Sequence, residues 1–170
     1  MRTIAKTRSF KTDPITVFDA LDDLGVTGMH MTKSSMPMMG GKMDLNFLSS
    51  NRTGLHTRYR WKGKVMWLHL DFTVEVSEWK RGISKIWETV GPAKLIIYSW
   101  FRMNMEVRQF GDASAVTLSI TYSKPNNLFG RLLCYFVGDW YCKWCINNML
   151  GDAAMRIAAN NVKSQSSTFI

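Results

Sequence analysis

The sequence predicts a single α+β domain in which a curved antiparallel sheet of six to seven strands wraps around a long C-terminal helix. Polar and apolar residues alternate over most of 42–122, short turns separate the alternating runs, and apolar residues recur at helical spacing beyond residue 127. Antiparallel strands joined by short turns form one sheet with one apolar face. The long helix is the segment available to cover that face.

The chain begins with a predicted strand followed by two helical segments. Residues 2–11 are typical of a strand, and at Thr12-Asp13-Pro14 a capping side chain precedes a proline at the first helical position. Gly25 is expected to end this first helix. A short second helical piece then precedes a methionine-rich loop at 36–41. The apolar residues at helical spacing are Val17, Phe18, Leu21 and Leu24.

Six further strands are predicted between residues 42 and 122. Alternation is clear at 42–47, 55–62, 66–76, 101–108 and 116–122, with a turn expected at Gly63. Another strand is predicted at 83–90, between Gly82 and Gly91-Pro92, and the alternation does not decide which of its faces points inward. The apolar face elsewhere includes Phe47, Tyr59, Trp61, Phe101, Met103, Met105 and Tyr122.

The C-terminal helix is predicted to begin after Lys124-Pro125-Asn126-Asn127 and to run to about Asn161. The stripe expected to face the sheet is aromatic in its first half and small in its second. Large rings hold a helix away from a sheet and small residues let it lie close, so a wedge-shaped apolar cavity is expected between them. The stripe comprises Phe129, Leu133, Phe136, Val137, Trp140, Trp144, Ala154 and Ala158.

Composition limits the classes of function. The 170 residues fit one domain, predicted at 1–163 with a polar tail at 164–170. The net charge is +9, but no run of basic residues exceeds two, so nucleic-acid binding is not expected. Three cysteines without a recognisable signal peptide favour a cytoplasmic protein without disulfides. The longest apolar stretch, 132–137, is far shorter than the roughly 18 residues of a membrane span.

Two sequence stretches resemble those of a known superfamily. Phe10-Lys11-Thr12-Asp13-Pro14-Ile15-Thr16-Val17-Phe18 is similar to a strand end followed by apolar-x-Ala-Pro-x-x-Val-Trp/Phe. His56-Thr57-Arg58-Tyr59-Arg60-Trp61 is similar to Gly-Thr-x-aromatic-x-Trp, with His56 in the place of the glycine. With the Gly91-Pro92 turn and the Pro125 helix entry, the chain resembles the START-like helix-grip superfamily (SRPBCC), which includes polyketide cyclases and dehydratases, lipid-transfer domains and birch-pollen-allergen proteins. The resemblance implies binding of an apolar ligand between sheet and helix, in many members without catalysis.

The candidate ligand-binding residues come from the methionine-rich loop, the apolar sheet face and the helix stripe. Methionine adapts its shape to a guest, and aromatic rings provide apolar walls. Asn147 is expected to turn its amide inward, toward a sheet side chain or the polar end of a ligand. The predicted set is Met36, Met38, Met39, Phe47, Tyr59, Trp61, Phe101, Met103, Met105, Tyr122, Phe136, Trp140, Trp144 and Asn147.

Neither a metal site nor a cofactor site is predicted. Cys134, Cys142 and Cys145 can lie along one side of the helix, but that helix offers no histidine as a fourth zinc ligand. His56 and His69 fall on the solvent-facing sides of their strands, and no phosphate-binding or dinucleotide-binding motif is present.

Three hypotheses for function follow, while the ligand and the oligomeric state stay open. The first is non-catalytic binding of a hydrophobic small molecule such as a lipid, isoprenoid or polyketide. The second is an enzyme of the cyclase/dehydratase kind, for which Tyr59, Tyr122, Lys6 and Arg8 are the titratable candidates. The third is an accessory protein whose basic face, with Arg58, Arg60 and Lys62, contacts an anionic membrane or partner.

Overall fold

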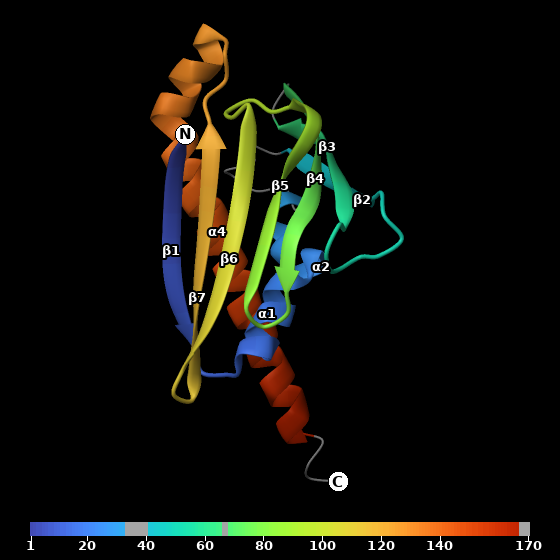
Figure 1. Ribbon diagram of the computed structural model, residues 1–170, viewed down its shortest axis with the longest axis vertical. Coiled ribbons are helices and arrows are strands. Elements are labelled where there is room, and N and C mark those ends of the chain that lie inside the picture. Colours follow the sequence, from blue (N-terminus) through green and yellow to red (C-terminus); the bar gives the residue numbers. More distant parts are fainter. Residues whose placement is uncertain (33–40, 66–67, 167–170) are drawn as a thin grey trace.

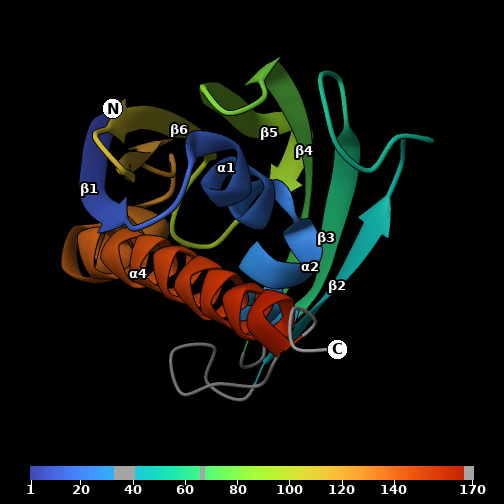
Figure 2. The ribbon, with the colours of Figure 1, turned by 90° about the horizontal axis from the view of Figure 1, so that it is seen from below.

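The computed structural model describes residues 1–32, 41–65 and 68–166 and confirms the predicted α+β architecture. A seven-stranded sheet curves around a long helix, with three short helices after the first strand (Figures 1 and 2). The elements in chain order are β1 (Arg2–Phe10), α1 (Pro14–Asp22), α2 (Leu24–Thr27), α3 (Met29–Thr32), β2 (Lys42–Phe47), β3 (Arg58–Val65), β4 (Leu68–Lys80), β5 (Ser84–Lys94), β6 (Trp100–Phe110), β7 (Ala113–Ser123) and α4 (Leu128–Ser166).

All neighbouring strands of the sheet are antiparallel, in the order β1-β7-β6-β5-β4-β3-β2. Strands β2 to β7 therefore form the predicted meander, and β1 pairs with β7 at the far edge. On the concave face, β7 contributes every second residue to the core, and β6 does the same from Met103 to Val107. The buried residues of β7 include Val116, Leu118, Ile120 and Tyr122.

The first helix begins as predicted. Asp13 is its N-cap, with the carboxylate accepting a hydrogen bond from the Thr16 backbone at 2.9 Å, and Pro14 occupies the first turn. Val17 and Phe18 are completely buried. Gly25 does not end the helix, contrary to the prediction. The chain leaves α1 at Asp23, whose side chain caps the Gly25 backbone and starts α2.

Two expected turns lie inside strands. Gly63 belongs to β3, where a Cβ atom would collide with the Lys42 carbonyl oxygen of β2. A glycine is required there by the close approach of two strands. The Gly91-Pro92 pair lies within β5, which continues to Lys94. The β4–β5 register shifts at this point, so the glycine and proline mark a bulge in the strand.

Helix α4 starts at the predicted place and extends beyond the predicted end at Asn161. The Asn127 side chain accepts a hydrogen bond from the Gly130 backbone at 2.6 Å and caps the helix. Its buried side differs from the predicted stripe, because Phe129, Phe136 and Ala158 are exposed. Between Leu128 and Asn160, the residues that α4 buries are Gly130, Cys134, Gly138, Cys142, Cys145, Ile146, Met149, Leu150, Ala153 and Ile157. No helix in the described part of the chain combines the length and apolar character needed to cross a bilayer.

Candidate functional site: an apolar cavity between sheet and helix

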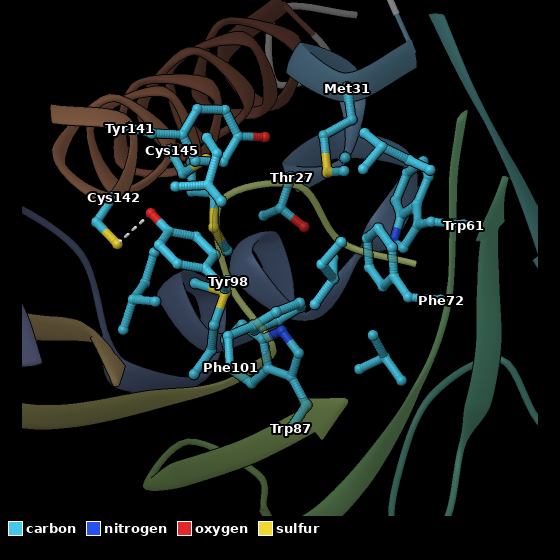
Figure 3. Close-up of a pocket in the computed structure, with 18 of the residues that line it drawn as sticks. Thr27, Met31, Trp61, Phe72, Trp87, Tyr98, Phe101, Tyr141, Cys142 and Cys145 are labelled. Atoms are coloured by element: carbon cyan, nitrogen blue, oxygen red, sulfur yellow. Dashed lines mark hydrogen bonds between the residues drawn. The ribbon is translucent and has the colours of Figure 1, made fainter. Parts of the chain in front are cut away.

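A cavity of about 310 Å³ lies between the concave face of the sheet, the short helices and α4 (Figure 3). Its volume falls at the lower end of the range of roughly 300–1,000 Å³ that is usual for small-molecule sites. The wall is formed mostly by apolar and aromatic side chains. They come from α1–α3 (Leu21, Leu24, Thr27, Gly28, Met31), from β3–β7 with the β5–β6 connection (Tyr59, Trp61, Leu70, Phe72, Val74, Lys85, Trp87, Leu95, Ile96, Ile97, Tyr98, Phe101, Met103, Ile120), and from α4 (Leu133, Val137, Trp140, Tyr141, Cys142, Cys145, Met149).

Aromatic rings on the sheet keep the helices away from it. Phe72 and Phe101 meet edge to face, with their ring centroids 5.7 Å apart. In Figure 3, Trp61, Phe72, Phe101 and Trp87 line the sheet side of the cavity opposite α4. Packed rings of this size prevent the helix from lying directly on the strands. The cavity expected from the sequence is present, but the expected cause is wrong: Phe129 and Phe136 of the helix stripe are exposed, and the rings that line the cavity lie mainly on the sheet.

The helix side of the cavity is held by a buried hydrogen-bond cluster. The Tyr98 hydroxyl donates to the Gly138 carbonyl oxygen at 2.6 Å, and the Cys142 sulfur lies 3.1 Å from the same hydroxyl oxygen (Figure 3). The Tyr98 ring also lies against the Tyr122 ring, at 4.4 Å between centroids. Tyr98 thus links the connection between β5 and β6 to the middle of α4, and it fixes the width of the cavity there.

The cysteines next to this cluster are unreactive by environment. Burial raises the pKa of the Cys142 thiol to about 11, although its hydrogen bond with Tyr98 opposes part of the rise. Burial also raises the pKa of Cys145 well above its ordinary value. The thiolate is the form that attacks electrophiles and binds metals, so these thiols act as apolar wall groups at neutral pH. Among the described residues, no group of three or more His, Cys, Asp and Glu side chains is placed to hold a metal ion.

One charged pair is buried at the cavity wall. Lys85, on β5, donates from its Nζ to Asp22 Oδ1 at 2.5 Å, and the two side chains are only 3% and 7% exposed. The Trp79 indole donates to the other carboxylate oxygen at 2.9 Å, and the Lys85 ammonium lies 4.9 Å from the centre of the Trp87 ring. Burial lowers the pKa of Lys85, and the carboxylate of Asp22 opposes that change. Among the described residues that line the cavity, Lys85 is the basic one, and its ammonium is paired with Asp22.

The structure places five of the predicted ligand-binding residues in the cavity wall: Tyr59, Trp61, Phe101, Met103 and Trp140. Met105 and Tyr122 are buried on the same sheet face, outside the wall. Phe47 packs against Tyr59, and Trp144 against Tyr141, so both are half-buried and do not line the cavity. Met36, Met38 and Met39 lie outside the described residues.

Two predicted placements are wrong. Phe136 is 70% exposed, because it lies on the outer side of the first half of α4. Asn147 is also exposed, and its side-chain oxygen accepts a hydrogen bond from the Lys6 ammonium at 2.6 Å. The amide does contact a sheet side chain, as one expectation had it, but on the surface. Lys6 and Arg8, which donates to the Leu150 carbonyl oxygen at 3.3 Å, bridge β1 and α4 and do not line the cavity.

The prediction did not include Lys85, Trp87 and Tyr98, or the helix residues Tyr141 and Met149. Lys85, Trp87 and Thr89 alternate along β5 and all point inward. Because a lysine and a threonine lie on the inner face, the sequence of that strand does not alternate between apolar and polar residues in the usual way. The position of Trp87 was the available signal, because a large ring on a central strand is usually buried.

Comparison with solved structures identifies the architecture as the helix-grip fold. The protein TTHA0849 from Thermus thermophilus superposes with a TM-score of 0.69 at 18% identity, over 94% of this chain and 99% of that one. The ZhuI aromatase/cyclase from Streptomyces sp. R1128 superposes with a TM-score of 0.65 at 12% identity, over 92% of this chain and 95% of that one. Norcoclaurine synthase from Thalictrum flavum, in complex with dopamine and hydroxybenzaldehyde, superposes with a TM-score of 0.64 at 10% identity, over 93% of this chain and 87% of that one.

These likenesses confirm, at the level of the fold, the resemblance inferred from the sequence. They do so without close sequence similarity. No protein-family model matches the sequence, and no curated protein matches it either.

Proposed function

We propose that this protein binds a small hydrophobic molecule, such as a lipid fragment, isoprenoid or polyketide, in the cavity between its sheet and α4. The observation that carries the proposal is the cavity itself, about 310 Å³ and walled almost entirely by apolar and aromatic side chains. Burial of apolar surface is worth about 25 cal/mol per Å² before the costs of ordering the ligand. The occurrence of a cyclase and of a ligand-bound synthase among proteins of this fold supports the proposal.

The test compares two valine substitutions. Val137→Trp places an indole in the cavity from α4, whereas Val90→Trp places the same group on β5 at a half-buried position outside the cavity wall. The neutral dye N-phenyl-1-naphthylamine, which fluoresces in apolar sites, is titrated into each variant. We expect Val137→Trp to weaken dye binding at least about tenfold and Val90→Trp to leave it within about twofold.

Native mass spectrometry of the purified protein, with a thermal-shift panel of apolar compounds, completes the test. A retained or stabilising apolar molecule is expected. The proposal fails if the wild-type chain retains no compound, no compound raises its melting temperature, and the two valine variants bind the dye equally well.

A second candidate function is catalysis of the cyclase/dehydratase kind, favoured by the buried Lys85–Asp22 pair. An ammonium in an apolar wall stabilises negative charge that develops on a carbonyl oxygen, because few water molecules compete for it. Lys85→Met keeps most of the unbranched side chain and removes the ammonium. A catalytic role predicts that Lys85→Met abolishes turnover of a bound carbonyl compound while binding of the dye persists; unchanged turnover overturns it.

A further inference from the structure

The first half of α4 carries a row of large apolar side chains on its outer side. Leu128, Leu132, Phe136 and Trp140 follow one another at intervals of four residues, and Tyr135 lies three residues after Leu132, which places all five along one side of the helix. All are exposed, from 53% for Trp140 to 83% for Leu128. Together they form what we call the α4 stripe. Apolar patches of this kind on a protein surface mark places where another surface is bound.

The position of the stripe explains its exposure. In Figure 1 the first turns of α4, in orange, extend past the ends of β1 and β7, so the sheet does not cover them. Tyr135 and Phe136 pack against each other at the surface, with 5.3 Å between ring centroids. The later part of the same helix buries its apolar residues against the domain. The stripe is thus a separate feature and not a part of the core.

The charges around the stripe are positive. Lys124, Arg131 and Lys143 are exposed before, within and after it. The one acidic residue in this stretch, Asp139, is neutralised by an ion pair with Arg2, and it also accepts a hydrogen bond from the Tyr122 hydroxyl at 2.6 Å. The whole chain carries a net charge of +9. An apolar row with basic flanks is complementary to an anionic lipid surface.

The basic face first expected to contact a membrane is less suited to that role. Arg58 pairs with Glu75, and Arg60 forms a two-pronged ion pair with Asp71 on the neighbouring strand. These arginines are therefore largely compensated by acidic residues of the same protein. The α4 stripe, in contrast, combines exposed basic neighbours with large apolar groups that can enter a bilayer interface, where Trp and Tyr are enriched.

The stripe also adjoins the cavity. Trp140 belongs to both, and Leu133 and Val137 on the adjacent side of the helix line the cavity wall. A bilayer that contacts the stripe therefore lies next to the α4 wall of the cavity. We propose that the α4 stripe docks this protein on anionic phospholipid bilayers, so that an apolar ligand exchanges between the bilayer and the cavity. The proposed docking depends only on the surface of α4, whereas the proposed ligand exchange also depends on the proposed function of the cavity.

The test measures partition onto vesicles of phosphatidylcholine with about 30% phosphatidylglycerol, on the order of the anionic content that attracts basic segments. The double variant Leu132→Ser/Phe136→Ser removes two exposed groups of the stripe. The matched control Leu48→Ser/Phe110→Ser removes the same two residue types from exposed sites elsewhere. We expect the stripe variant to lose at least about tenfold in partition and the control to stay within about twofold. Pure phosphatidylcholine vesicles or high salt should weaken wild-type binding.

The outcomes separate the two proposals. Equal partition of both double variants, or no binding of the wild type at low salt, overturns docking. The same holds if gel filtration shows a dimer that only the stripe variant converts to a monomer, because the stripe is then an interface between two copies. Dye binding by the stripe variant reports on the cavity independently of docking. Loss of partition together with full dye binding supports docking. Absence of dye binding in the wild type contradicts the proposed function and leaves docking unaffected.

Discussion

The two halves of α4 use similar residues for opposite purposes. Between Ile146 and Ile157, the helix buries Leu150 and Ala153 almost completely where it contacts α1, α2 and β1. Between Leu128 and Trp140, the large apolar side chains are mostly exposed, and the buried positions are the small residues Gly130, Cys134 and Gly138. Helical spacing is thus common to both halves, and the difference lies in what packs against them. An apolar stripe shows that one side of a helix is hydrophobic, but the neighbouring elements decide whether that side becomes part of the core or of the surface.

The largest expected effect compares two leucines on this helix. Leu150 is 1% exposed and Leu132 is 60% exposed. Leu150→Ala should lower the free energy of unfolding by about 2–5 kcal/mol, because it leaves a cavity in packed surroundings, while Leu132→Ala should change it by less than about 0.5 kcal/mol. Urea denaturation followed by circular dichroism measures both. Similar losses of unfolding free energy in both variants would show that the first half is also part of the core, and would contradict the difference between the two halves.

Cys142, where the two halves meet, gives a prediction in pH. Its pKa is raised from 9.0 to about 11, so the thiol is protonated in the folded and unfolded chains below pH 9. Between pH 9 and 11 the unfolded chain loses this proton first, and stability should fall by on the order of 2–3 kcal/mol before levelling off. Unfolding of wild type and Cys142→Ala in reducing buffer isolates the effect. Parallel pH profiles would mean that Cys142 is open to water.

A smaller effect is expected where the connection between β5 and β6 is tied to the middle of α4. Tyr98→Phe removes the hydroxyl that donates to the Gly138 carbonyl oxygen. The loss of one buried hydrogen bond should lower the free energy of unfolding by about 1 kcal/mol, while dye binding changes only modestly. Hydrogen exchange near the middle of α4 should become faster. An unaltered exchange rate there would show that packing alone holds the helix in place.

The smallest effect concerns the surface contact beside the buried half. Lys6→Ala removes the hydrogen bond to Asn147, which is exposed on both sides. Exposed polar contacts contribute little, so the expected change in unfolding free energy is below about 0.5 kcal/mol. Thermal denaturation of Lys6→Ala beside Asn147→Ala provides the measurement. A loss above about 1 kcal/mol in either variant would reveal a structural role for this bridge.

The predicted strands show how far pattern reasoning reaches. Alternation predicted the meander because one face of each strand packs on the core, and the cap at Asp13 predicted the start of α1. Glycine was less informative. Gly63 serves the close approach of two strands, and Gly91 lies in a bulge, and neither requirement is visible in the local sequence. The site was partly foreseen: Tyr59 and Trp61 line the cavity, but Lys85 was missed because its charge is matched by Asp22, 63 residues away in sequence.

By itself, the sequence determined the element types, their order and the presence of a long amphipathic helix over an aromatic sheet face. These depend on spacing within a single segment and therefore need no knowledge of neighbours. Tertiary structure alone decided which side of α4 is buried, where the cavity lies and which charges meet. Burial and pairing depend on contacts between segments distant in the chain, as when α1 brings Asp22 to Lys85 while the first turns of α4 extend past the sheet.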